Sequence, residues 1–343
     1  MRRTVVPEII SFAARDGFAL NLHHFPNGRA RQAQPVIVLH GAGVRSNVFL
    51  PPTDETLVSA LLDASYDVWL LNWRASIDLP PNEWTLEDAA VLDHPAAVQT
   101  VLDRTDAKTL KAVIHCQGST SFMMAITAGL LPRVTTVISN AVALHPIVPR
   151  LAWLKSEYVT NTAARLMPYL NPQWGLSAPH GWPTLIDWFV RATHHECNNP
   201  VCKHSSFTFG AGFPTLWQHE NLDEATHEWL KGEFAHVPLT FFREMRGCID
   251  AGSLVSSGKY DELPANFVSQ APKTDARFVF LAGQLNNCFV AESQRRSFDF
   301  FDRYAPARNA FYELAGYGHL DVFVGKNAAR DNFPLIIDEL GRN

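Results

Sequence analysis

One short stretch combines a reactive side chain with the backbone that a nucleophile needs: Ile114-His115-Cys116-Gln117-Gly118-Ser119. An apolar run from Leu110 precedes it, and apolar residues at helical spacing follow it. A thiol between a strand and a helix lies at a helix N-terminus, where backbone N–H groups face a developing negative charge. The order is that of a nucleophile elbow, G-x-S-x-G, with Cys116 replacing Ser and Ile114 replacing the first Gly. The pattern predicts Cys116 as the nucleophile; the alternative is a buried core thiol.

A thiol nucleophile needs a base, and the base needs a partner that orients it. His319 follows the last predicted strand, in Gly316-Tyr317-Gly318-His319-Leu320-Asp321, and is the predicted base. The preceding strand leads into Gly283-Gln284-Leu285-Asn286-Asn287-Cys288, where Asn286 takes the place at which a carboxylate is expected. We therefore predict a Cys-His-Asn trio in which the Asn286 oxygen accepts the imidazole N–H. Asn286 as a plain turn residue remains open, with Asp250 as the substitute acid.

The loop His40-Gly41-Ala42-Gly43 follows a predicted buried strand. Its glycines allow close backbone approach to a ligand, so we expect the N–H groups of Ala42 and Gln117 to form an oxyanion hole. His40, Gly41, His115 and Trp73 are the expected substrate contacts. No metal and no cofactor are expected in this chemistry.

Strands and helices alternate along most of the chain, which predicts a mostly parallel, doubly wound α/β sheet. Predicted strands cover residues 8–14, 19–25, 35–40, 67–73, 110–114, 134–143, 277–283 and 310–314. Predicted helices cover residues 54–64, 93–104, 122–131, 224–234, 291–304 and 327–340. The Asp16-Gly17 turn joins the first two strands as a hairpin.

The rhythm changes between Pro146 and Pro264, where prolines and six of the tryptophans gather. We expect residues 1–145 and 265–343 to form the α/β core and residues 146–264 to form a mostly helical cap. Such insertions lie over the carboxyl edge of the sheet, where ligands bind.

Bulk properties exclude several classes of function. The 343 residues are 47% hydrophobic and 18% charged, which is ordinary for a globular enzyme and not for a disordered chain. A net charge of −5 without a basic stripe argues against a nucleic-acid partner. Because no window is apolar enough for a membrane span or a secretory signal, we expect a cytoplasmic protein without stable membrane insertion. A homodimer stays open.

The chain resembles α/β-hydrolases of the acid-lipase-like and esterase type, including the hydrolase domains beside sterol-oxidase-type flavoproteins. The resemblance rests on residues 38–43, 67–74, 115–119 and 316–321, and on Asp250-Ala251-Gly252-Ser253-Leu254-Val255. It covers nearly the whole chain and implies the α/β-hydrolase fold and a small apolar acyl substrate, an ester or thioester. Cys116 and Asn286 depart from the plain lipase pattern. Cysteine at the elbow also occurs in dienelactone hydrolases and some polyketide thioesterases, so acyl transfer or cyclisation is an alternative to hydrolysis.

A second group of reactive residues lies in the predicted cap: His194-His195-Glu196-Cys197-Asn198-Asn199-Pro200-Val201-Cys202-Lys203-His204. Thiols and imidazoles at this spacing are compatible with zinc, and also with a packed or redox-reactive loop or a disulfide. Two further functions stay open for the whole chain. One is a non-catalytic protein that binds an apolar ligand, and the other is a lyase or cofactor-free oxygenase that uses His319.

Overall fold

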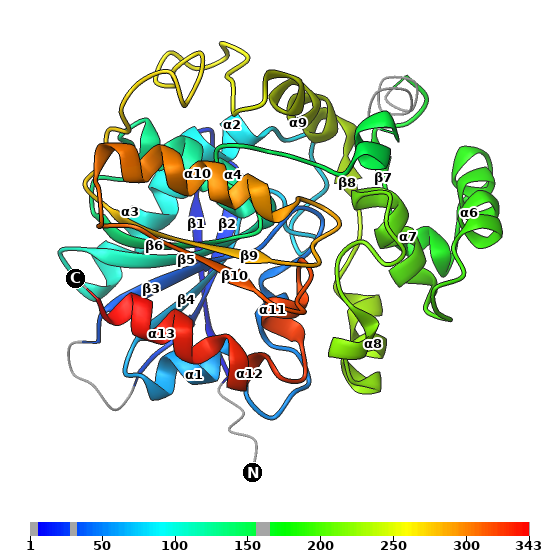
Figure 1. Cartoon of the computed structure of the whole chain (residues 1–343), viewed down its shortest axis with the longest axis horizontal. Helices are drawn as coiled ribbons and strands as arrows, with labels where there is room; N and C mark the ends of the chain where they lie inside the picture. Colours follow the sequence, from blue (N-terminus) through cyan, green and yellow to red (C-terminus); the bar gives the residue numbers. More distant parts are fainter. Residues whose placement is uncertain (1–5, 28–32, 156–164, 343) are drawn as a thin grey trace.

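The computed structural model describes residues 6–27, 33–155 and 165–342, and its centre is one eight-stranded sheet (Figure 1). The strand order is β1-β2-β4-β3-β5-β6-β9-β10. The strands are β1 (Glu8–Ala13), β2 (Ala19–Phe25), β3 (Pro35–Leu39), β4 (Asp67–Asn72), β5 (Leu110–His115), β6 (Val134–Asn140), β9 (Arg277–Gly283) and β10 (Ala310–Leu314).

Six of these strands run parallel, from β4 to β10, while β2 is antiparallel to both of its neighbours. Every residue of β3, β4, β5 and β9 is buried, because helices cover both faces and the strands are almost wholly apolar. The predicted mostly parallel, doubly wound sheet is confirmed.

Helices cover the two faces of the sheet unequally (Figure 1). The helices α1 (Leu57–Asp63) and α13 (Phe333–Gly341) lie on one face, and α3 (His94–Thr105), α4 (Cys116–Thr127) and α10 (Ala291–Tyr304) lie on the other. Thr56 starts α1 with a capping box, in which its side chain and that of Ser59 each accept a hydrogen bond from the other's backbone. Pro95 lies in the first turn of α3, where its missing N–H costs nothing.

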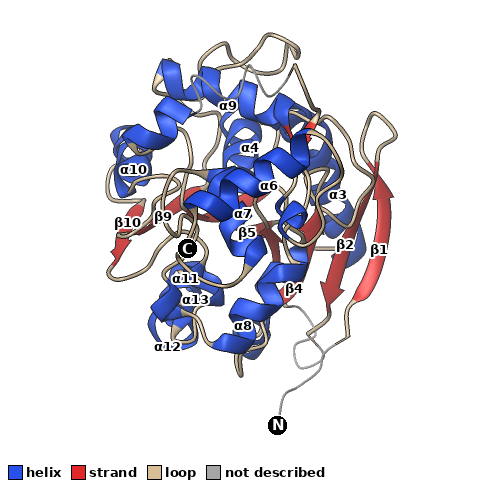
Figure 2. Cartoon of the chain, turned by 90° about the vertical axis from the view of Figure 1, so that its right-hand side faces the viewer, coloured by secondary structure: helices blue, strands red, loops and turns tan. Residues whose placement is uncertain are grey.

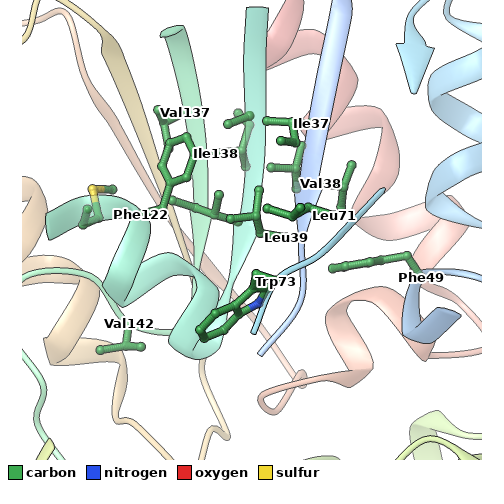
Figure 3. Close-up of a cluster of buried hydrophobic side chains, with 14 of the residues drawn as sticks. Ile37, Val38, Leu39, Phe49, Leu71, Trp73, Phe122, Val137, Ile138 and Val142 are labelled. Atoms are coloured by element: carbon green, nitrogen blue, oxygen red, sulfur yellow. The ribbon is translucent and has the colours of Figure 1, made fainter. Parts of the chain in front are cut away.

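One part of the hydrophobic core lies between the central strands and α4 (Figure 3). Side chains of β3, β4 and β6 meet there, with Trp73 just beyond the end of β4 and Phe122 from α4 packed against them. Trp73 and Phe122 are fully buried. Burying apolar surface of this extent is the main force that holds the strands in register and the end of β5 in place.

Residues 146–264 lie between β6 and β9, and those that the structure describes add no strand to the central sheet. Figure 2 shows α6 and α7 in front of the sheet's strands, and Figure 1 shows α6, α7 and α8 together at the right of the molecule. The elements of this segment are β7 (Tyr169–Leu170), η3 (Pro172–Gly175), α6 (Trp182–Thr193), α7 (Pro200–Phe209), η4 (His219–Asn221), α8 (Glu224–Trp229), η5 (Leu230–Gly232), β8 (Val237–Pro238) and α9 (Leu239–Ala251). Residues 150–155 are also helical.

Several predicted helices have other bounds in the structure. The helix predicted over 224–234 is α8 followed by the 3₁₀ turn η5. The closing helix predicted over 327–340 is two helices, α12 (Ala328–Asp331) and α13, because Pro334 starts a new helix after Asn332. The helix predicted from Asp93 is preceded by α2 (Leu86–Asp88) and a π-helical turn, η2 (Ala89–Asp93). The remaining short elements are η1 (Ser46–Phe49) and α11 (Asp321–Val324). None of the helices in the described ranges has the length and apolar content to cross a membrane.

Candidate active site

The turn between β5 and α4 has an unusual backbone at its central residue. Strand β5 ends at His115 and α4 begins at Cys116 without an intervening loop. Cys116 has a φ of 54°, in the left-handed region that residues other than glycine rarely adopt. Such strain is found where the surrounding structure fixes a functional side chain. The turn has the geometry that the sequence predicts for a nucleophile elbow.

Two glycines allow the backbone to come close to this turn. A Cβ atom on Gly41 would lie 2.8 Å from the Cβ of Cys116 and 3.1 Å from its Sγ. A Cβ atom on Gly118 would collide with the carbonyl oxygen of His40. The loop after β3 and the first turn of α4 therefore touch at a separation that only glycine permits.

Two backbone groups act on the thiol of Cys116. Hydrogen bonding from the N–H groups of Gln117 and Ala42 lowers its pKa. Burial has the larger effect and raises the pKa of Cys116 to about 12, so the resting group is a neutral thiol. The two predicted oxyanion donors are therefore both neighbours of this sulfur.

His319 approaches Cys116 from the loop after β10. The sulfur of Cys116 and ring nitrogens of His319 and His115 all lie within 4.8 Å of one another. Gly283, at the end of β9, touches the carbonyl of Gly318, so this loop and the loop that carries Asn286 are in close contact. The structure thus brings Cys116, His319 and Asn286 together from three separate parts of the chain.

The amide of Asn286 is turned the opposite way from the prediction. Its oxygen accepts the backbone N–H groups of Cys288 and Phe289, at 2.9 and 3.1 Å. Its nitrogen therefore faces Nδ1 of His319 at 3.1 Å and donates a hydrogen bond to it. Rotating the amide would set its NH₂ group against two N–H donors. The expected acceptor role of Asn286 is wrong, and the imidazole keeps its proton on Nε2.

His115 is held in the same tautomer by a second asparagine. The side-chain nitrogen of Asn140, at the end of β6, donates to Nδ1 of His115 at 2.9 Å and to the carbonyl of His319 at 3.2 Å. The carbonyl fixes the orientation of this amide, because only an NH₂ group can donate to it. Sequence reasoning assigns no role to Asn140. The signal that could have identified it is a polar residue at the end of an apolar strand, at the carboxyl edge of the sheet.

The trio of His115, Cys116 and His319 is also a possible set of metal ligands by distance. An imidazole that binds a metal through Nε2 normally donates its Nδ1–H to an acceptor. Here both Nδ1 atoms accept hydrogen bonds from amides, which puts the protons on the nitrogens that would bind the ion. These residues fit a proton-transfer or binding site better than a metal site.

Burial keeps the imidazoles neutral. It lowers the pKa of His319 to about 3, and burial with two nearby imidazoles lowers the pKa of His115 well below its usual value. Nε2 of His319 has no hydrogen-bond partner among the described residues. At neutral pH the site therefore holds a thiol and two uncharged rings, and not a thiolate–imidazolium pair.

A largely apolar cavity opens beside Cys116 and Gln117 and contains about 1000 Å³ when its open mouth is included. Its walls carry Phe207 and Phe209 from α7 and Met245 from α9. Lys155 also lines it, and the Nζ of Lys155 donates to the carbonyl of Gly210 at 2.7 Å. Cys288 is a second buried thiol on the wall, which the pattern did not single out. A smaller space, lined by Gly41, Ala42, His115, Cys116 and His319, adjoins it.

Three predicted site residues have other positions. Trp73 and His40 are fully buried, and the indole N–H of Trp73 donates to the carbonyl of His40 at 3.0 Å. Neither lines the two cavities at Cys116, so they support the loop from beneath and do not contact a substrate there. Asp250 forms an ion pair with Arg246 on α9 at 2.7 Å, while the residue bonded to His319 is Asn286, so Asp250 is not the substitute acid.

Solved structures share this architecture over nearly the whole chain. A soluble variant of monoglyceride lipase from Saccharomyces cerevisiae, solved with a substrate analogue, covers 99% of this chain and 95% of its own, with a TM-score of 0.63 and 14% identity. Bromoperoxidase from Bacillus anthracis covers 98% of this chain and 100% of its own, with a TM-score of 0.58 and 13% identity. The chain has the α/β-hydrolase fold. At these identities, the structural likeness speaks for the fold alone.

Curated sequence relatives of this chain are lipases and sterol esterases. Human lipase member K is 27% identical over 229 residues, which are 61% of this chain and 56% of the relative. Rat lysosomal acid lipase/cholesteryl ester hydrolase is 27% identical over 152 residues, 39% of this chain and 38% of the relative. The matches thus span about half or less of the relatives' length. No family model matches the sequence.

Proposed function

We propose that this α/β-hydrolase cleaves, or transfers, the acyl group of an apolar ester or thioester through an acyl-thioester on Cys116. The observation that carries the proposal is the left-handed turn that holds Cys116 at the start of α4, where the backbone N–H groups of Ala42 and Gln117 lower the pKa of its thiol. Donors placed in this way stabilise the oxyanion of acyl transfer, and losing one costs about 10²–10³ in rate.

The cavity supports an apolar acyl group as the substrate. Its walls come mainly from residues 146–264, which we infer to act as a cap over the elbow. Aromatic and aliphatic side chains dominate them, and the space suits a ligand of lipid-like character. The names of the relatives, lipase and cholesteryl ester hydrolase, agree with such a substrate.

In the proposed step, the sulfur of Cys116 attacks the acyl carbonyl. The bond from carbon to sulfur forms, the bond from carbon to the leaving oxygen or sulfur breaks, and the thiol proton ends on the leaving alcohol or thiol. His319 would carry that proton. Water, an alcohol or an amine would then release the acyl group and restore the thiol, giving hydrolysis, transfer or cyclisation.

Asn286 makes this proton transfer difficult. To take the thiol proton at Nε2, His319 must first carry its own proton on Nδ1. That nitrogen faces the NH₂ group of Asn286, so the shift breaks one hydrogen bond and sets two donors against each other. In a serine protease triad, replacing the acid by its amide costs about 10⁴ in rate for this tautomer reason. We therefore propose a slow acylation in the resting arrangement.

The same observation favours a second candidate, a non-catalytic protein that binds an apolar ligand beside Cys116. A neutral thiol and an imidazole with the wrong tautomer can line a binding cavity without reacting. The two candidates differ in one measurable property, the formation of a covalent adduct on Cys116.

The test is intact-protein mass spectrometry after incubation with acyl thioesters and p-nitrophenyl esters of increasing chain length. We expect an acyl adduct that Cys116→Ala abolishes. Cys288→Ser is the matched control, because Cys288 is a buried thiol on the wall of the same cavity. An adduct that moves to Cys288, or that survives Cys116→Ala, contradicts the proposal. Absence of an adduct, together with ligand uptake by the protein, favours the binding candidate.

A further inference from the structure

Four potential metal ligands meet in the segment between β6 and β9, and none of them lines the two cavities at Cys116. The sulfurs of Cys197 and Cys202 and ring nitrogens of His219 and His227 all lie within 4.8 Å of one another. Nε2 of His219 is 3.3 Å from Sγ of Cys202. Ligand atoms around a tetrahedral zinc, at ~2.3 Å for sulfur and ~2.1 Å for nitrogen, are separated by about 3.5 Å. The distance of 3.3 Å agrees with this separation, and the bound of 4.8 Å admits the other pairs.

We propose that Cys197, Cys202, His219 and His227 bind a structural zinc ion. Two thiolates and two imidazoles are a donor set that suits zinc, and four protein ligands leave no open position for a substrate. The inference concerns the architecture of the segment and does not depend on any chemistry at Cys116.

The histidines next to the two cysteines in sequence do not complete this set. His204 is paired with Asp187 at 2.9 Å, His194 contacts the hydroxyl of Thr193 at 2.9 Å, and His195 contacts the carbonyl of Ala192 at 3.0 Å. The imidazoles of His219 and His227 come instead from η4 and α8. The cluster is thus formed by tertiary structure, which sequence spacing alone does not reveal.

One imidazole of the cluster lacks a hydrogen-bond partner. The Nε2 of His227 is buried and has no hydrogen-bond partner among the described residues. Buried polar groups are normally paired, so this exception indicates a missing partner. A zinc ion would supply it, whereas a disulfide between the two thiols would not.

Further hydrogen bonds hold the ligands from behind. The side-chain oxygen of Asn199 accepts the N–H of Cys202 at 3.0 Å, and its nitrogen donates to the carbonyl of His227 at 2.6 Å. One asparagine therefore ties α7 to α8 beside the cluster. Such supporting contacts are usual around metal sites, where they orient the ligands.

The cluster is also connected to the loop that carries His319. The carboxylate of Asp321 accepts the N–H of Gln218 at 3.2 Å and the side chain of Asn221 at 2.7 Å, on either side of His219. Its other oxygen accepts the N–H of Gly318 at 2.9 Å. A zinc ion here would fasten α7, η4 and α8 to one another and, through Asp321, to the candidate catalytic loop.

The first test measures metal in protein that carries no histidine tag and is purified without chelators. We expect about one zinc per chain. Cys202→Ser and His227→Ala should reduce the zinc content at least tenfold. Cys248→Ser and His195→Ala are the matched controls, because these residues lie outside the cluster, and they should keep the zinc. Wild-type protein without zinc, or variants of the cluster that retain it, would overturn the proposal.

The second test needs no variant and therefore holds even if the variants fail to fold. Reduced wild-type protein is stripped of metal and titrated with Co²⁺. Tetrahedral coordination by two thiolates predicts visible d–d bands and a thiolate-to-cobalt charge-transfer band, both lost when zinc is added. Absence of these bands overturns the proposal. The proposal is also overturned if mass spectrometry of the denatured, unreduced protein finds a Cys197–Cys202 disulfide, which lowers the mass of the chain by two hydrogens.

Discussion

The side-chain nitrogen of Asn286 donates a hydrogen bond to Nδ1 of His319, 3.1 Å away, at the position where an acid would accept one. The N–H groups of Cys288 and Phe289 hold the amide in this orientation. The same two N–H groups would hold one oxygen of a carboxylate equally well, leaving its second oxygen to face the imidazole. Replacing the side-chain nitrogen of residue 286 by an oxygen would therefore give a group that accepts a hydrogen bond from Nδ1–H of His319.

Asn286→Asp should therefore accelerate acylation of Cys116. The second carboxylate oxygen accepts Nδ1–H, frees Nε2 as a base and raises the pKa of His319, which burial holds at about 3. Restoring the acid should raise the acylation rate by about 10²–10⁴, the inverse of the loss seen when a triad acid becomes an amide. The rate is measured by quenching the acylation reaction at successive times and determining the acylated fraction by intact-protein mass spectrometry.

Asn287→Asp is the control for this prediction, because it adds the same charge one residue away. The side chain of Asn287 contacts the carbonyl of Pro214 at 3.3 Å and does not contact His319. An unchanged rate in Asn286→Asp, or an equal gain in Asn287→Asp, would show that the tautomer of His319 does not limit the reaction.

The sequence predicts the meeting of Cys116, His319 and Asn286 for a simple reason. Each follows the end of a strand, and the carboxyl ends of parallel strands meet at one edge of the sheet. The direction of the Asn286 hydrogen bond cannot be obtained in this way. It depends on which backbone groups face the amide oxygen, and no pattern of side chains encodes that.

Two other features show what sequence reasoning can and cannot predict. The break between α12 and α13 can be predicted from Pro334, because proline interrupts the hydrogen bonding of a helix. The partners of Cys197 and Cys202 cannot be predicted from the sequence, because His219 and His227 reach them only through the packing of η4 and α8 against α7. Local rules fix elements, while tertiary packing selects which side chains meet.

The alkylation of Cys116 should have a simple pH dependence. Burial raises the pKa of its thiol to about 12, so the reactive thiolate is scarce at neutral pH and increases as pH rises. Labelling by iodoacetamide, mapped to Cys116 by peptide mass spectrometry, should rise about tenfold per pH unit from pH 7 to 10. A plateau near neutral pH would instead reveal a thiolate–imidazolium pair with His319 and contradict the neutral resting state.

Gly118→Ala should destabilise the fold and disturb the elbow. The added methyl group meets the backbone carbonyl of His40, which cannot rotate away. Overpacking of this kind costs about 1–3 kcal/mol in the free energy of unfolding, measured by urea denaturation. Gly247→Ala is the matched control, because Gly247 lies in α9 with open space around its Cβ position. It should stabilise the protein by about 0.5–1 kcal/mol, and equal losses in both variants would contradict the steric argument.

Met245→Trp should shorten the acyl chains that the protein accepts. Met245 is buried on α9 and lines the large cavity beside Cys116, so an indole there fills space that a long chain would occupy. We expect adduct formation with long acyl thioesters to fall by tenfold or more relative to acetyl or butyryl thioesters, whose rates stay within a few-fold of wild type. Arg243→Gln, at an exposed position on the same helix, should leave this ratio unchanged. If Met245→Trp slows short and long chains equally, the acyl group lies elsewhere, and the smaller space lined by His115 and His319 becomes the candidate.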